Sequence, residues 1–153
     1  MSIQGLMKLD TWRRAKDFGL DIYRQVLPML PPDEKWSLAQ QFRRSSTSIS
    51  ANIAEGFGRF SYQENVRFCY YARGSLDECL SHLVFCHEMG FIQETLFKEL
   101  EKKGEKIYRM LNGYISYLKK SKKGLSEPGA SVMEPELEAI HNNDDTHVQT
   151  HSS

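Results

Sequence analysis

The segment from Ser61 to Gly90 constrains the fold most, because its apolar residues alternate in steps of three and four. This series, which we call the seam, is Cys69, Ala72, Leu76, Cys79, Leu83 and Cys86. A mean spacing of 3.5 residues is typical of a helix that packs lengthwise against other helices, and excludes a strand. Ser61-Tyr62-Gln63-Glu64 forms a capping box at its start, and Gly90 ends it.

Three further segments show helical periodicity, and no run of alternating β-branched residues indicates a strand. The expected helices run from about Asp10 to Leu27, from about Glu34 to Ala54 or Gly56, from Ser61 to Gly90, and from near Phe91 to about Lys123. Their connections are short, so neighbouring helices should be antiparallel. The sequence therefore predicts an all-α fold, an antiparallel up-down-up-down four-helix bundle.

Prolines and glycines mark the expected boundaries. The first helix should stop at Pro28, because proline lacks the backbone N–H that a helix interior needs. Asp33 is the expected N-cap of the second helix. Gly56 and Gly58 should end that helix, one of them in the left-handed conformation.

Charge divides the chain into two parts, although 20 basic and 20 acidic residues balance overall. All 20 Lys and Arg lie in residues 1–124, beside 14 acidic residues, whereas residues 125–153 hold 6 acidic and no basic residues. We expect a bundle over 1–124 and a disordered acidic tail over 125–153. A basic body favours anionic partners.

Targeting features favour the cytoplasm. Residues 1–11 contain no apolar stretch that could serve as a signal peptide, and no run is long enough to span a membrane. The three cysteines are an odd number, which fits a reducing compartment with free thiols. We therefore expect a cytoplasmic protein without a membrane partner.

Two motifs carry a family resemblance, the segments 48–59 (SISANIAEGFGR) and 67–76 (RFCYYARGSL). Together with Leu9, Trp12 and Ala15, with Phe42-Arg43-Arg44 and with Gly90-Phe91-Ile92, they resemble the four-helix-bundle family encoded by intervening sequences in bacterial large-subunit (23S) ribosomal RNA genes. The resemblance covers about residues 9–120. Ala51 stands where the family usually has proline, which should leave the second helix straighter.

The resemblance implies a ring-shaped homopentamer. A distant relative, the accessory variability protein of diversity-generating retroelements, is a basic pentamer that binds nucleic acid and a reverse transcriptase. The family itself has no assigned activity, so the resemblance defines a fold and a set of partner classes rather than a reaction.

Four arginines are the candidate nucleic-acid-binding residues, namely Arg43, Arg44, Arg59 and Arg67. The planar guanidinium donates two parallel hydrogen bonds to a phosphate. Phe57, Phe60 and Tyr62 flank Arg59 and could stack on bases. The alternative is a solvated face with ion pairs between subunits.

Five residues of the two motifs have an expected structural role: Asn52, Glu55, Gly56, Gly58 and Arg73. Arg73 lies on the apolar stripe and needs a partner, either within the bundle or on another subunit. Antiparallel pairing sets it level with Ser45 and Ser46. Asn52 and Glu55 should hold the start of the first helix, near residues 8–11. They lack a histidine or second carboxylate in the same motif, which disfavours acid–base catalysis.

Cys79, His82 and Cys86 share one side of their helix, so a metal site is geometrically possible. Two of them are seam positions, where cysteine packs as a small hydrophobe, and we favour packing over a metal.

We expect no metal, cofactor or catalytic residue. The expected function is that of a non-enzymatic oligomer that binds DNA or RNA, structured RNA in particular, or scaffolds a nucleic-acid-processing protein. The alternative is a purely structural or protein-interaction module.

Overall fold

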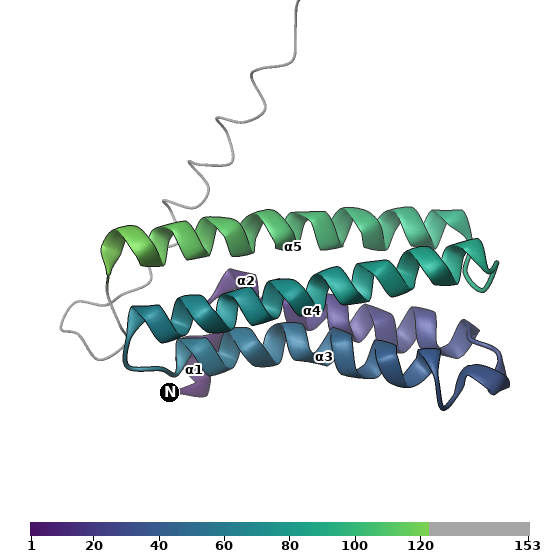
Figure 1. Cartoon of the computed structure of the whole chain (residues 1–153), viewed down its shortest axis with the longest axis horizontal. Coiled ribbons are helices and arrows are strands. Elements are labelled where there is room, and N and C mark those ends of the chain that lie inside the picture. Colours follow the sequence, from purple (N-terminus) through teal and green to yellow (C-terminus); the bar gives the residue numbers. More distant parts are fainter. Residues whose placement is uncertain (123–153) are drawn as a thin grey trace, which may run out of the picture.

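Four long helical segments run side by side along one axis in the computed structural model, which describes residues 1–122 (Figure 1). The expected acidic tail, 125–153, lies outside the described residues. The α-helices are α1 (Ile3–Met7), α2 (Asp10–Asp21), α3 (Leu38–Phe57), α4 (Tyr62–Glu88) and α5 (Glu94–Ser121). No strand occurs within residues 1–122. The predicted all-α four-helix bundle is confirmed.

The core lies along the seam of α4. All six predicted seam residues, from Cys69 to Cys86, are at most 1% exposed. The other helices supply the large side chains opposite them, among which Phe18, Phe42, Leu111 and Tyr114 are fully buried. Each large apolar side chain removed from water contributes about 1.5–3 kcal/mol before the entropy of ordering is subtracted.

Close contacts set the register between the helices. A Cβ on Gly56 of α3 would lie 2.7 Å from Asn65 Oδ1 of α4, and one on Gly104 of α5 would lie 2.5 Å from Leu80 Cδ2. Tyr114 of α5 accepts a hydrogen bond from Asn65 Nδ2 at 3.2 Å. These pairings place the end of α3, the start of α4 and the end of α5 together, at the left in Figure 1.

The first predicted helix is less regular than expected. After α2 the backbone continues as a π-helical segment, Ile22–Val26, and a 3₁₀ turn, Leu27–Met29. Pro28 cannot donate to the carbonyl four residues earlier, and its ring clashes with that carbonyl. The ladder therefore widens, and the N–H of Leu27 bonds to the carbonyl of Ile22.

The predicted start of the second helix is wrong by four residues. Pro32–Glu34 form a 3₁₀ turn, and α3 begins at Leu38. The carboxylate of Glu34, rather than that of Asp33, accepts the N–H of Leu38 at 3.3 Å and the hydroxyl of Ser37 at 2.5 Å. A residue that precedes proline is disfavoured in the α conformation. The chain therefore first changes direction through the 3₁₀ turn, and the regular helix starts after it.

The predicted left-handed conformation at Gly56 or Gly58 is also wrong. Gly56 lies in the last turn of α3, and Gly58 has a φ of −79°. Among the described glycines, Gly90 has a positive φ, +75°. There the N–H of Phe91 bonds to the carbonyl of Cys86 at 3.0 Å, which closes α4 as predicted. The predicted Ser61 cap is confirmed, since its Oγ accepts the N–H of Glu64 at 3.2 Å.

A short N-terminal helix, α1, was not foreseen from the sequence. Ser2 Oγ accepts the N–H of Gly5 at 3.0 Å and caps it. Leu6 and Leu9 are buried, and a Cβ on Gly5 would lie 3.7 Å from the Phe57 ring. The helix thus covers the apolar end of α3. The sequence pattern of this helix consists of the capping Ser2 and the apolar Leu6 and Leu9, and it is too short to show helical periodicity.

Candidate nucleic-acid interface

The four predicted arginines fall into two pairs that lie far apart. Arg43 and Arg44 lie near the start of α3, whereas Arg59 and Arg67 lie at and beyond its opposite end. Phe57 lies thirteen positions after Arg44 in the same helix, and at 1.5 Å per residue this distance is about 20 Å. Within one copy of the chain the four candidate arginines therefore do not form a single cluster.

Arg44 is neutralised where it lies. Its Nη2 is 2.8 Å from Glu78 Oε1 and 2.9 Å from Gln41 Oε1. The same Glu78 oxygen is 3.5 Å from His82 Nε2. Arg43 is exposed, and the ion pairs described within residues 1–122 do not include its guanidinium. Of these two arginines, one therefore already has a carboxylate partner.

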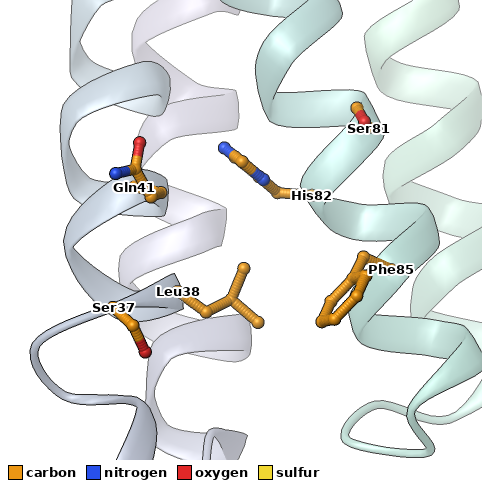
Figure 2. A pocket seen from close by; sticks show the side chains of 6 residues that line it. All are labelled: Ser37, Leu38, Gln41, Ser81, His82 and Phe85. Carbon is orange, nitrogen blue, oxygen red and sulfur yellow. The ribbon is translucent and has the colours of Figure 1, made fainter.

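A pocket of about 330 Å³ opens beside this pair, between α3 and α4 (Figure 2). In Figure 2 the His82 ring reaches toward Gln41, while Leu38 and Phe85 lie below them on facing helices. The remaining lining residues are Ser37 and Ser81. The Ser37 hydroxyl already donates to Glu34, and no carboxylate lines the pocket, so its lining assembles no hydroxyl–histidine–carboxylate arrangement.

The other end of the bundle is strongly basic. We call residues 55–76 and 106–122, which the antiparallel pairing of α4 and α5 brings together, the basic end. It holds eight basic and two acidic residues, whereas residues 77–105 hold three basic and seven acidic ones. Its basic residues are Arg59, Arg67, Arg73, Lys106, Arg109, Lys119, Lys120 and Lys122.

Sequence reasoning missed half of this surface. The lysines at the end of α5 suit the helix dipole and lie outside the two motifs on which the candidate arginines depend. They lie about 50 residues from Tyr70 along the chain, yet Lys119 Nζ donates to the Tyr70 hydroxyl at 2.7 Å. The signal that could have revealed them is the absence of acidic residues after Glu105 in the described part of the chain.

Arg59 and Arg67 share the ring of Phe68. The guanidinium carbons lie 5.0 and 5.7 Å from the ring centroid. Arg59 also pairs with Glu55, while Arg67 Nη2 lies 3.7 Å from Glu64 Oε1. The structure thus brings together two of the four predicted arginines, around an aromatic ring that sequence reasoning left out.

Arg73 has a partner, as predicted, but on a different helix. Its Nη1 donates to Asn112 Oδ1 of α5 at 2.9 Å, and its guanidinium carbon lies 4.9 Å from the Tyr70 ring centroid. The prediction that Arg73 lies level with Ser45 and Ser46 of α3 is wrong. Arg44 of α3 meets Glu78 of α4 at 2.8 Å, so its neighbour Ser45 lies opposite the part of α4 around Cys79 rather than around Arg73.

Asn52 and Glu55 bond within their own part of the chain, which corrects the prediction that they hold the start of the first long helix. Asn52 Nδ2 donates to the Ser48 carbonyl at 2.8 Å, and Glu55 pairs with Arg59. The N-terminus does approach this region, since a Cβ on Gly58 would lie 3.5 Å from Met1 Cβ. The end of α3 is therefore a packing site for α1 and α4.

The cysteines lie in the core, as the seam pattern predicts. Burial raises the pKa of Cys69 and of Cys79 to about 12, and that of Cys86 to about 11. Within residues 1–122, no group of three or more His, Cys, Asp or Glu side chains is placed to hold a metal ion. Over the same residues, no helix is long and apolar enough to cross a membrane.

The fold and this surface define a class: small antiparallel four-helix bundles with one basic, aromatic-rich end. Comparison with known proteins then identifies the family. A sequence model of the family described as 23S rRNA-intervening sequence protein matches residues 7–113, so the chain belongs to that family. The resemblance inferred from the two motifs is confirmed.

One similar solved structure is the crystal structure of a protein of unknown function from the S23 ribosomal protein family of Bacteroides thetaiotaomicron. It superimposes with a TM-score of 0.63 at 21% sequence identity, covering 69% of this chain and 97% of that chain. At this identity the likeness supports the fold alone. No curated protein matches the chain significantly.

Proposed function

We propose that this protein is a non-enzymatic, cytoplasmic helical bundle that binds RNA through its basic end. The observation that carries the proposal is the excess of eight basic over two acidic residues at one end of the bundle. The family name refers to 23S rRNA, which makes ribosomal RNA the first ligand to test. DNA is the second.

The basic end suits phosphate because its cations are available. Arg67 and Lys119 are exposed, and besides its contact with the Phe68 ring Arg67 makes a 3.7 Å ion pair with Glu64. Exposed pairs of this kind contribute about 0–1 kcal/mol, so a phosphate can displace Glu64 at little cost. Each phosphate that is neutralised releases counterions, which makes binding favourable at low salt.

The salt dependence of binding tests this proposal. We would measure fluorescence anisotropy of labelled rRNA fragments from low to physiological salt. Arg67→Gln combined with Lys119→Gln should weaken binding and reduce the slope of log K against log salt by roughly one unit per lost contact. The matched control is Lys98→Gln with Lys102→Gln, at the other end of α5, which should leave both unchanged. Failure of the wild type to bind at low salt would contradict the proposal.

We also propose that the chain forms a homo-oligomer, with five copies as the number that the resemblance implies. The outward face of α3 carries small residues, among which Thr47 and Ala51 are exposed. A surface of this kind lets a neighbouring helix approach closely. Size exclusion with light scattering measures the number of copies, and a monomer at tens of micromolar would contradict it.

A second candidate function is protein interaction, favoured by exposed apolar side chains at the opposite end. Trp36 is 74% exposed and Phe85 is 53% exposed. In this alternative the bundle scaffolds a partner, for instance a nucleic-acid-processing protein, and has no RNA affinity of its own. Steep salt-dependent RNA binding by the isolated protein would favour the first function over this one.

A further inference from the structure

We propose that the basic end recognises unpaired nucleotides, and that bases stack on aromatic side chains presented by α4 and the turn before it. The inference rests on the proposed function, nucleic-acid binding at this end, and adds the form of the ligand. It is carried by the coincidence, on one surface, of exposed aromatic rings and an excess of basic over acidic side chains.

Three aromatic side chains are exposed there. Phe60 in the α3–α4 turn is 76% exposed, Tyr71 is 52% exposed and Tyr70 is 38% exposed. Tyr70 and Tyr71 lie three and four residues after Arg67, so these side chains share the outward stripe of α4. Stacking surfaces and phosphate-binding cations therefore alternate within one helical turn.

Neighbouring side chains hold the two tyrosine rings in place. The ring of Tyr71 meets Phe68 edge to face at a centroid distance of 5.5 Å. Tyr70 receives the hydrogen bond from Lys119, whose Nζ also lies 5.3 Å from the ring centroid. Because the rings are already ordered, a base that stacks on them loses less conformational freedom than one that must order them first.

This arrangement favours single strands over duplexes. In a duplex the base faces are stacked on one another, and a protein surface meets sugar and phosphate. In a single strand each base has a free π-face, so a row of rings interleaved with cations can bind both parts of the nucleotide. Cations alone would bind either form through phosphate.

Gly74 adds a separate observation. It lies in the middle of α4 on the same stripe, where glycine is less favourable than alanine. A Cβ at Gly74 would meet no heavy atom within 4 Å, so internal packing does not require the glycine. The bare backbone beside Tyr70 and Tyr71 leaves room for a ligand to approach closely.

The experiment compares two RNA probes of equal length, an unstructured oligouridylate and a perfect duplex, with the full chain. We expect the single strand to bind more tightly, by on the order of tenfold, at the same salt concentration. Phe60→Leu and Tyr71→Leu should each weaken single-strand binding by on the order of 5- to 100-fold, the range for loss of one stacked base. Duplex binding should not change.

Phe85→Leu is the matched control, since this ring is on the same helix and 53% exposed, but lies within residues 77–105, where acidic residues outnumber basic ones. It should leave both affinities unchanged. Equal affinity for the two probes, with the expected salt dependence, would overturn this inference and leave the proposed function intact. Binding of neither probe would overturn both. If the leucine variants alter the light-scattering mass but not RNA affinity, the rings belong to a subunit interface and the inference is wrong.

Discussion

Replacing Gly56 by alanine should destabilise the fold, because the added methyl group has no room. Its Cβ would lie 2.7 Å from Asn65 Oδ1, 2.9 Å from Phe68 Cβ and 3.0 Å from the Asn65 carbonyl oxygen. Phe68 Cβ is bonded directly to the backbone of α4 and the Asn65 carbonyl oxygen is part of it, so neither atom can rotate away. Asn65 Oδ1 can move only if the amide that bonds to Tyr114 moves with it.

Two opposing effects set the magnitude. Alanine in place of a helical glycine is favourable by up to about 1 kcal/mol. Overpacking between rigid elements is unfavourable by about 1–3 kcal/mol, and loss of the Asn65–Tyr114 hydrogen bond adds about 1 kcal/mol. The steric effect should win because α3 and α4 can separate only as whole helices. We expect the free energy of unfolding to fall by about 1–3 kcal/mol.

Urea unfolding followed by circular dichroism, at one protein concentration, measures this change. Gly74→Ala is the matched control, since its Cβ would meet nothing within 4 Å. That variant should gain up to about 1 kcal/mol from helix propensity. The two substitutions are chemically identical, so the prediction is a difference in sign. A Gly56→Ala protein at least as stable as the wild type would refute the close approach of the two helices.

Three further predictions address the buried polar groups and the charge. Tyr114→Phe leaves Asn65 Nδ2 without its buried partner and should lower the free energy of unfolding by about 1–2 kcal/mol in the same urea titration; an unchanged midpoint would contradict this. Burial raises the pKa of Cys79 from its ordinary 9.0 to about 12, so the folded state holds its proton while the unfolded state loses it, and stability should fall as the pH rises from about 9 toward 12. Cys79→Ala should be less stable by about 1 kcal/mol or more at neutral pH and should show a weaker decline above pH 9; an identical decline would exclude the thiol as its cause. Deletion of residues 125–153 removes 6 carboxylates attached after α5, whose end lies at the basic end, and should tighten RNA binding by on the order of three- to thirty-fold at low salt. Equal affinities of the full and shortened chains at low salt would show that the tail does not compete for these cations.

The sequence by itself determined the helices and their buried faces. The seam from Cys69 to Cys86, the Ser61 cap and the Gly90 stop all follow from interactions within a few residues, and all are confirmed. Where local signals conflicted, the prediction was less accurate. The prolines before α3 shifted its start to Leu38, because the chain first had to form a turn that the helical pattern does not encode.

Only the tertiary structure decided which charges act together. It separated Arg44 from Arg59, gave Arg73 a partner on α5, and brought Lys119 to Tyr70. The physical reason is the register between antiparallel helices, which contacts such as Gly56 against Asn65 determine. Shifting one helix by a few residues would keep every apolar stripe buried and yet change every surface pairing. Periodicity therefore predicts the core, while the composition of the basic end depends on where the helices meet.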